Sequence, residues 1–432
     1  MRQFRYVPRL RRARKGVQRR GEPAEGADAI VMSITKPKNA EYLIAILILS
    51  LSLFGCLMVY SSSSHYAEQN LGDSMFFFKR QLLWFIIALA CGFGAYLIGY
   101  KRMLKYSSYL LGISVLLLLV VLFTEPVRNV HRWLRIGPFN FQPSEMAKIA
   151  LILFTASALA QLSNQIRDWK SYISITTVAA IVCGLVLIEP DIGSTLTLSA
   201  SIGMMLYVAG AKGRHLLTAI SGGSGIIALM IFGFGYEKDR ILDWIVGLLN
   251  PFNSPYQVKQ GLIAIGSGGI TGSGLGSGGQ KLLFLPEPHS DFIYANIAEE
   301  TGMMLTIPLL ASFLFLFYLG VRVAMRIEEK SGKLIAFGLI SLISISALTN
   351  IGVVLGVLPV TGLPLPFISY GGSSMLFSMI SIGIILSVIR ESNTITNQEK
   401  YRFDRYSLRS RWYRRSHISG NSYRPQAYKR KT

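Results

Sequence analysis

Long hydrophobic runs separated by short polar segments recur along the chain between residues 42 and 389. Each run is close to the roughly 20 residues that a helix needs to cross a hydrocarbon layer about 30 Å thick. A lipid-exposed backbone must satisfy its own hydrogen bonds, so each run is predicted to be helical. The expected spans lie near residues 42–60, 81–100, 107–124, 144–162, 171–188, 193–210, 216–234, 300–320, 335–355 and 372–389.

The composition supports the same fold class. Hydrophobic residues make up 51% of the chain and charged residues 16%, which is too apolar for an ordinary soluble protein. The sequence therefore predicts an all-α polytopic membrane protein with about ten transmembrane helices. The longest segment between spans, 235–299, joins spans seven and eight.

Positive charge is concentrated at the two ends of the chain. Residues 1–41 hold 11 Lys and Arg against 4 Asp and Glu, and residues 390–432 hold 12 against 3, so the tails carry 16 of the 21 net positive charges. With ten spans both tails lie on one side, and the positive-inside rule makes that side cytoplasmic. We therefore expect two basic cytoplasmic tails around a membrane domain at 42–389, with segment 235–299 forming a large outer loop.

The basic tails have two interpretations. RRARKGVQRR (11–20) and RSRWYRRS (409–416) are rich enough in arginine to bind nucleic acid. Attraction to anionic lipid of the inner leaflet, together with the setting of topology, explains them without a nucleic-acid-binding fold, of which the sequence gives no sign. We favour the lipid interpretation and expect no nucleic-acid partner.

A titratable cluster and a glycine-rich stretch mark the predicted outer loop. The stretch LPEPHSDFIYANIAEETG (285–302) contains Glu287, His289, Asp291, Glu299 and Glu300. Before it, GSGGITGSGLGSGG (266–279) matches a nucleotide-binding glycine pattern, but no predicted βαβ unit surrounds that match. We interpret 266–279 as a tight turn close to a ligand or to another backbone. Because the whole loop mixes aromatic and charged residues, it is expected to pack on the membrane domain.

A second polar segment, HRWLRIGPFNFQPSEMAK (131–148), precedes a predicted span. Pro143 suits the first turn of a helix, and Ser144 is a candidate cap. Glu145 and Lys148 then share one helix face. Ionisable residues in a membrane usually mark a functional cavity. The alternative is an ion pair that braces two helices.

Two further polar segments are expected on the same outer side. In IEPDIGST (188–195), Glu189 and Asp191 face the other polar segments, although a simple turn and helix start also explain them. In 350–374, four helix breakers force irregular backbone at membrane depth: Pro359, Gly362, Pro364 and Pro366. Such backbone is tolerated only where it lines protein or a water-filled cavity. The four polar segments together predict one outward-facing pocket.

Residues 350–374 resemble the C-terminal signature of the shape, elongation, division and sporulation (SEDS) family of membrane peptidoglycan glycosyltransferases. HRWLRIGPFNFQPSEMAK, EPDIGST, PYQVKQGLIAIGSGG and LPEPHSDFI follow the order of that family, so the similarity covers roughly residues 42–390. PYQ (255–257) and PEPHSDF (286–292) are more similar to the cell-division (FtsW) branch than to the elongation (RodA) branch. Ser346 stands where the family often has Gln, and no essential role is expected for it.

The resemblance implies an activity and a set of residues. The family polymerises lipid II, a disaccharide-pentapeptide on undecaprenyl pyrophosphate, at the outer face of the bacterial cytoplasmic membrane. It also implies that Asp291 is catalytic, that Glu145 and Lys148 are functionally important, and that Trp133 is an important aromatic. A class B penicillin-binding protein, other division proteins and a location at the septum are implied in the same way.

The chemistry of the residues agrees with that expectation. A sugar hydroxyl needs a base, which a carboxylate such as Asp291 supplies, with His289 as a candidate for tuning it. The pyrophosphate leaving group needs cationic neutralisation, for which the candidates are Lys148, Arg132, Arg135, Arg240 and Lys259. A divalent cation, magnesium or manganese, on Glu189 or Asp191 is the alternative. The remaining substrate-binding candidates are Gln142, Ser144, Gln260, Glu287, Ser369, Tyr370 and Gly371.

Two other functions are compatible with the same sequence features. A lipid II flippase would also need buried ionisable residues and broken helices, but nearer the middle of the membrane. A non-catalytic division scaffold would need neither a base nor a pocket. The expected position of the polar segments at the outer boundary favours the enzyme.

Overall fold

The computed structural model describes residues 37–125, 131–137, 139–233, 238–279, 285–286 and 288–394. Within them, eight helices are long and apolar enough to cross a membrane, and two shorter apolar helices accompany these. The long ones are α2 (Pro37–Leu71), α3 (Phe76–Ile98), α6 (Pro143–Leu162), α7 (Trp169–Ile188), α9 (Gly213–Ala228) with a π-helical turn (Leu229–Gly233), α12 (Ile293–Arg326), α13 (Lys330–Val354) and the helix Gly372–Thr394. The shorter ones are α5 (Ser107–Val121) and α8 (Ile192–Val208). The predicted all-α membrane fold is confirmed.

Several helices extend beyond the predicted spans. Helix α2 runs to Leu71 rather than to residue 60, and α12 starts at Ile293 rather than at residue 300. Polar residues suggested earlier ends, but a helix accommodates them when their hydroxyls find partners within it, as Ser63 does by donating to the Val59 carbonyl at 2.6 Å. Hydropathy alone cannot show that a polar side chain forms its hydrogen bond within its own helix.

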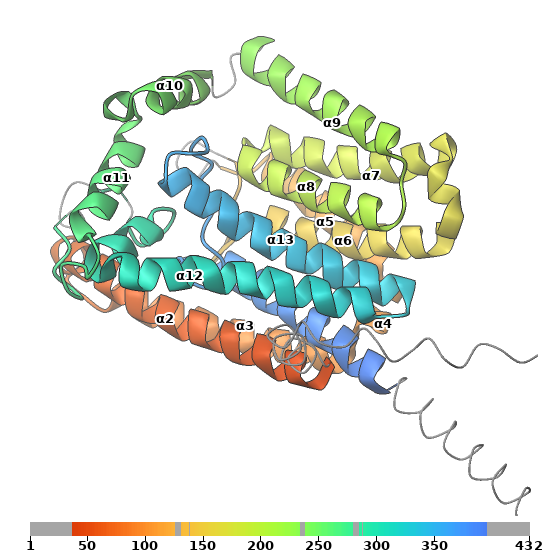
Figure 1. The fold of residues 1–432 in the computed structure, drawn as a ribbon, viewed down its shortest axis with the longest axis horizontal. Helices are drawn as coiled ribbons and strands as arrows, with labels where there is room; N and C mark the ends of the chain where they lie inside the picture. Colours follow the sequence, from red (N-terminus) through yellow and green to blue (C-terminus); the bar gives the residue numbers. More distant parts are fainter. Residues whose placement is uncertain are drawn as a thin grey trace, which may run out of the picture.

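Helix α13 lies at the centre of the bundle and contacts α12, α8 and α6 (Figure 1). Glycines allow the close crossings. A Cβ atom at Gly338 of α13 would lie 2.5 Å from Met205 Sδ and 2.9 Å from Ile152 Cγ2. Small residues at such crossings let helix backbones approach in a membrane, where dispersion contacts stabilise the packing. The buried polar segments described below are therefore carried on a tightly packed frame.

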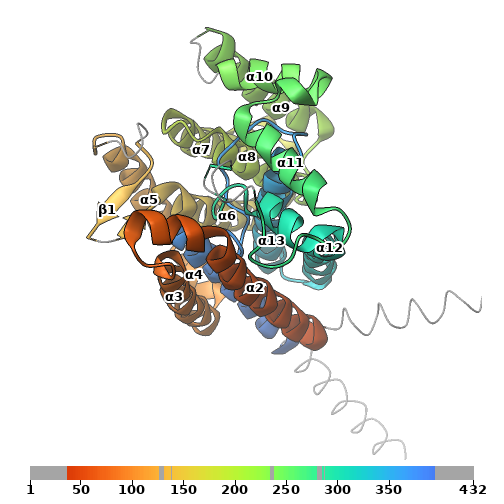
Figure 2. The same ribbon diagram turned by 90° about the vertical axis from the view of Figure 1, so that its left-hand side faces the viewer.

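Short elements complete the described chain. Strands β1 (Leu134–Ile136) and β2 (Phe139–Phe141) form an antiparallel hairpin, with Leu134 opposite Phe141, and lead directly into α6. The hairpin lies beside α5 (Figure 2). Helix α4 (Tyr100–Lys105) follows α3, and a 3-10 turn (Ser163–Arg167) follows α6.

The predicted outer loop, 235–299, is largely helical. It contains α10 (Lys238–Leu249), a 3-10 turn (Pro251–Asn253) and α11 (Tyr256–Gly268), and its last residues belong to α12. Helix α11 packs against α12 and α13, as expected, whereas α10 lies away from the bundle (Figures 1 and 2). The expectation that the whole segment packs on the membrane domain is wrong for α10, most of whose apolar residues remain exposed.

Helix α12 is broken at Gly302, and the glycine-rich segment (266–279) fills the break. Gly302 has φ 66° and ψ −168°. The N–H groups of Met303 and Met304 donate to the carbonyls of Gly269 and Ile270 at 3.0 and 3.1 Å. The chain thus closes on the broken helix through backbone contacts, as the interpretation of a tight turn near another backbone predicts.

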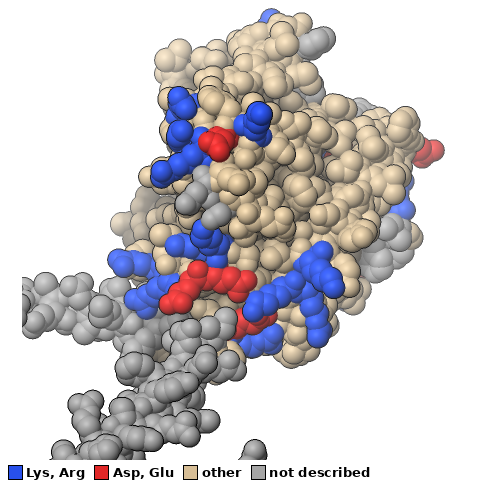
Figure 3. Space-filling view, turned by 90° about the vertical axis from the view of Figure 1, so that its right-hand side faces the viewer, with Lys and Arg blue, Asp and Glu red and all other residues tan. Residues whose placement is uncertain are grey.

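Charged side chains gather at the end of the bundle that lies opposite the glycine-rich segment, the right-hand end in Figure 1. Figure 3 shows this end, where Lys and Arg surround fewer Asp and Glu. Lys101 of α4 pairs with Glu391 at 2.9 Å, and Tyr100 donates its hydroxyl hydrogen to Glu329 at 2.6 Å. These contacts connect α4, the α12–α13 turn and the helix Gly372–Thr394. Most of the basic tails, residues 1–36 and 395–432, lies outside the described residues.

Candidate functional site

Glu145 and Lys148 form a buried ion pair on the first turns of α6. Pro143 opens this helix, where its missing N–H costs no hydrogen bond. Lys148 Nζ lies 2.8 Å from Glu145 Oε1, and the two side chains are 5% and 9% exposed. The spacing of three residues places both on one face, as the sequence predicts. Ser144, the candidate cap, is buried inside the helix instead of preceding it.

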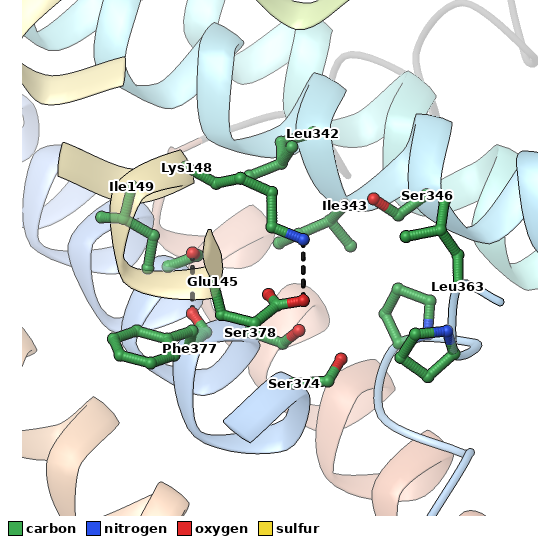
Figure 4. A pocket seen from close by; sticks show the side chains of 13 residues that line it. Glu145, Lys148, Ile149, Leu342, Ile343, Ser346, Leu363, Ser374, Phe377 and Ser378 are labelled. Atoms are coloured by element: carbon green, nitrogen blue, oxygen red, sulfur yellow. Dashed lines mark hydrogen bonds and ion pairs between the residues drawn. The ribbon is translucent and has the colours of Figure 1, made fainter. Parts of the chain in front are cut away.

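The ion pair opens into a pocket between α6, α13 and the helix Gly372–Thr394 (Figure 4). Its other lining residues are Ile149, Leu342, Ile343, Ser346, Leu363, Pro364, Pro366, Ser374, Phe377, Ser378 and Ser381. Ser346, for which no essential role is expected, therefore faces the same space as Lys148. The pocket joins one ion pair to several hydroxyls in otherwise apolar walls.

The broken segment between α13 and the last helix connects the pocket to the other predicted site residues. Leu363 and Pro364 line the pocket. A Cβ atom at Gly193, in the first turn of α8, would lie 2.7 Å from Leu363 Cγ. On the other side, a Cβ atom at Gly362 would lie 3.6 Å from Asp291 Oδ2. Irregular backbone at this depth is thus enclosed by protein, as its helix breakers predict.

Asp291 lies at the end of a short loop that is fastened to this broken segment. Asn350 Nδ2 donates to the carbonyls of Asp291 and Leu363 at 2.8 and 2.7 Å. Ser369 Oγ donates to the Ser290 carbonyl at 2.7 Å. The loop that carries Asp291 is therefore fixed by side chains on two other parts of the chain.

His289 and Tyr370 pack beside this loop. The Tyr370 N–H donates to the His289 carbonyl at 2.8 Å, and Gly371 follows directly. The His289 ring lies 4.4 Å from the Phe77 ring and 5.5 Å from the Tyr370 ring, centroid to centroid, and is buried. Burial raises the pKa of the Tyr370 hydroxyl, and Arg80 opposes that rise. The aromatic surroundings of His289 support a packing role for the ring.

Glu189 and Asp191 flank the turn between α7 and α8, Glu189 at the end of α7 and Asp191 at the start of α8. Asp191 Oδ1 accepts from the Ser194 N–H at 2.9 Å and so caps α8, while Oδ2 accepts from Gln142 Nε2 at 3.3 Å. Glu189 is fully buried. Burial and, to a lesser extent, the Asp191 carboxylate raise the pKa of Glu189 to about 9, even though Arg132 opposes the rise. Arg132 also donates to the Glu189 carbonyl at 2.9 Å.

A divalent cation would find few protein ligands here. Both Asp191 oxygens accept hydrogen bonds, whereas both Glu189 carboxylate oxygens are buried without a hydrogen-bond partner among the described residues. That part of the chain contains no group of three or more His, Cys, Asp or Glu placed to hold a metal. Glu189 therefore fits as a single carboxylate ligand, with the remaining ligands drawn from phosphate oxygens and water.

Several other predicted site residues lie on or beside α10, α11 and the β-hairpin. Arg240 is exposed on α10, whereas Lys259 and Gln260 are half-buried on α11, and none of the three lines the pocket. Trp133 is half-buried beside the hairpin, and Arg135 is exposed on β1. Glu287 lies outside the described residues.

Sequence reasoning did not select Asn350, Gln81 or Ser373 as site residues. Gln81 is buried and donates to the Ser369 carbonyl at 3.2 Å. Ser373 accepts from the Gln142 N–H at 3.2 Å and donates to the Asn140 carbonyl at 3.1 Å. The available signal was an amide or hydroxyl side chain in or beside an apolar run, since a polar group in a membrane must find partners.

Comparison with known proteins places the chain in a family. The family model described as cell cycle protein (FtsW, RodA and SpoVE) matches residues 41–394. A relative from Geobacter metallireducens, named probable peptidoglycan glycosyltransferase FtsW, is 37% identical over 83% of this chain and 96% of its own length. The stage V sporulation protein E of Bacillus subtilis is 36% identical over 83% of this chain and 99% of its own.

Solved structures agree. A chain from a study entitled "Structural coordination of polymerization and crosslinking by a peptidoglycan synthase complex" has a TM-score of 0.67 and 26% identity, covering 81% of this chain and 98% of its own. The rod shape determining protein RodA of Thermus thermophilus has a TM-score of 0.61 and 26% identity, covering 81% and 97%. The packed helices, the polar pocket and the matching sequence together show that this chain belongs to the FtsW/RodA/SpoVE family of multi-pass membrane proteins.

Proposed function

We propose that this chain is a peptidoglycan glycosyltransferase that polymerises lipid II into glycan strands. The observation that carries the proposal is the position of Asp291 beside Gly362, on the same broken segment whose next residues line the Glu145–Lys148 pocket. A carboxylate and a buried ion pair thus lie close to consecutive residues of one backbone segment. The names of the relatives support the same activity.

Asp291 is the proposed general base. It accepts the proton of the acceptor 4-hydroxyl, whose oxygen forms the new bond to C1 of the donor sugar. The bond between that C1 and the pyrophosphate oxygen breaks, and undecaprenyl pyrophosphate leaves with the electron pair. Because pyrophosphate is already a stable anion, no second carboxyl group is needed to protonate the leaving group, in contrast to a glycosidase.

Lys148 and Arg132 are the proposed cations for the diphosphate. Lys148 is buried, where a charge–charge interaction is stronger than in water, and Arg132 is anchored beside Glu189. None of Arg132, Arg135, Arg240 and Lys259 lines the pocket, and Arg132 is preferred among them because its bond to the Glu189 carbonyl anchors it at the turn between α7 and α8. Magnesium or manganese bound by Glu189 and by diphosphate oxygens would supply the same neutralisation.

The proposed setting is the bacterial cytoplasmic membrane at the division septum. The basic end of the bundle faces the cytoplasm under the positive-inside rule, so Asp291 faces outward, where lipid II is consumed. A class B penicillin-binding protein and other division proteins are the proposed partners, and anionic lipid is the proposed contact of the tails. The synthase complex that contains a similar chain supports a transpeptidase partner.

Transport of lipid II is the second candidate function. The buried Glu145–Lys148 pair and the broken segment beside it favour it, since transporters also place ionisable groups at interrupted helices. A flippase would move lipid II without joining its sugars.

Polymerisation of purified substrate separates these functions. The full chain in detergent is mixed with lipid II, so that no transport is needed for access, and glycan products are resolved by gel electrophoresis. We expect strands of many disaccharides, alone or after addition of the class B partner. If neither preparation yields polymer while lipid II crosses vesicle membranes that contain the protein, the transport function replaces the enzyme.

A further inference from the structure

Two buried glutamates that the proposed chemistry does not use fasten the glycine-rich segment to α12. Glu300 Oε2 accepts from the Ser61 hydroxyl at 2.6 Å and from the Gly276 N–H at 3.1 Å. Glu299 Oε1 accepts from the Gly279 N–H at 2.7 Å. A carboxylate withdrawn from water is costly unless it is hydrogen-bonded, and these donors satisfy that requirement.

The main chain of the same two glutamates also binds the segment. The carbonyls of Glu299 and Glu300, freed by the break at Gly302, accept from the N–H groups of Ser273 and Gly274 at 2.9 and 3.0 Å. Side-chain and backbone contacts therefore act on the same stretch of chain. Glu299 and Glu300 thus hold residues 273–279 through both their side chains and their backbone carbonyls.

The contacts extend to Asp291 through the first turns of α12. Phe292, the residue after Asp291, is buried against α11, where a Cβ atom at Gly261 would lie 3.1 Å from its ring. Asn296, one turn further, donates to Glu300 Oε1 at 3.4 Å. Since α11 continues directly into the glycine-rich segment, α11, that segment and the start of α12 pack as one unit with Asp291 at its edge.

Ser61 attaches this unit to the rest of the bundle. It belongs to α2, which lies beside α12, and its bond to Glu300 joins residues 239 positions apart in the chain. The unit is thus fixed to α2 by Ser61 and, through Asn350 of α13, to the broken segment at Leu363.

We propose that Glu300, supported by Glu299, is a positioning residue for glycosyl transfer: by holding the glycine-rich segment between α2 and α12 it sets the place of Asp291. The inference rests on the proposed role of Asp291. The position of Asp291 matters because a displacement of a reacting group by about 1 Å lowers a reaction rate by roughly 100-fold.

The test compares three variants and two matched controls in the lipid II polymerisation assay. Glu300→Ala removes the side-chain bonds to Ser61, Gly276 and Asn296, Ser61→Ala removes the first of these, and Glu300→Gln can keep them. The amide oxygen of Gln takes the place of Oε2, and its NH₂ can donate to Asn296 Oδ1, which is buried without a hydrogen-bond partner among the described residues. The controls are Glu328→Ala, at an exposed residue, and Ser62→Ala, whose hydroxyl donates to its own helix.

We expect Glu300→Ala to lower kcat by about 10- to 100-fold while KM stays within about two-fold, since alignment and not substrate binding is lost. Ser61→Ala should lower kcat by a smaller factor, and Glu300→Gln should stay within about three-fold of wild type. Both controls should match wild type. If Glu300→Ala fails to fold, the Ser61→Ala and Glu300→Gln results decide.

Three results would overturn the inference. One is a kcat for Glu300→Ala equal to that of its control, Glu328→Ala. If Glu300→Ala does not fold, a kcat for Ser61→Ala equal to that of Ser62→Ala has the same meaning. Another is a raised KM at unchanged kcat, which indicates substrate binding. The third is a folded Glu300→Gln with less than about a tenth of wild-type kcat, which would make the charge itself necessary. If Asp291→Asn is as active as wild type, the proposed function fails instead, so the two failures can be told apart.

Discussion

Lys148 Nζ lies 2.8 Å from Glu145 Oε1, one turn along α6, and both side chains are buried at a pocket that Leu363 of the broken segment also lines. With side chains only 5% and 9% exposed, the pair is much less hydrated than an ion pair on the protein surface. The energetic consequence is asymmetric, because removing one partner leaves an uncompensated buried charge.

Glu145 and Lys148 should therefore behave as one unit. Glu145→Gln and Lys148→Met are each expected to abolish most polymerisation and to lower stability by about 3–5 kcal/mol. The double variant should be more stable than the sum of the single effects predicts, as measured by thermal unfolding in detergent. Lys101→Met, at an exposed pair, is the control. Additive losses would show that the two residues act independently.

Asp291→Asn should leave the fold intact and remove the base. Asn is nearly isosteric, and the Asn350 bond to the backbone of residue 291 does not depend on the side chain. A fall of about 100- to 10,000-fold in polymerisation rate is expected for loss of a general base. The measurement is glycan formation by purified protein whose thermal unfolding matches wild type. A loss of only a few-fold would move the base elsewhere.

Glu189 should make stability depend on pH. Burial, with Asp191 adding to it, raises the pKa of Glu189 from its ordinary value of 4.5 to about 9, so the folded protein keeps a proton that the unfolded chain releases. The resulting stability is complete below pH 4.5 and is lost as pH rises towards 9. Glu189→Gln stays neutral and does not suffer this loss.

The measurement is the Tm of wild type and Glu189→Gln in metal-free detergent buffer at several pH values. The advantage of the Gln variant should grow between pH 5 and 9, the window set by the shifted pKa of Glu189, and then level off. Glu328→Gln, at an exposed residue, should show no such trend. Parallel curves for wild type and Glu189→Gln would mean that Glu189 is ionised in the fold.

Gly272→Ala should open the glycine-rich segment. Gly272 has φ +79°, and an added Cβ atom would collide with the Glu300 carbonyl. The left-handed backbone alone costs a non-glycine residue about 1–2 kcal/mol. We expect faster amide hydrogen exchange in 266–279 and a lower polymerisation rate. Gly266→Ala, which meets nothing within 4 Å, is the control. Equal exchange in both variants would contradict the close backbone approach.

The sequence alone determined the features that depend on local spacing. Hydrophobic run length gives the helices because a membrane leaves the backbone no other way to satisfy its hydrogen bonds. The three-residue interval between Glu145 and Lys148 gives their shared face because helix geometry fixes it. The glycines of 266–279 indicate close backbone contact because only glycine lacks a Cβ atom.

Tertiary packing decided which distant residues meet. Sequence could not show that Glu299 and Glu300 belong to a broken helix, because the N–H donors that satisfy them come from residues 273–279. Nor could it place Asn350 against Asp291, or Ser346 in the pocket with Lys148. Each of these contacts joins separate elements whose register is set by the packing of the whole bundle, and no local period in the chain encodes it.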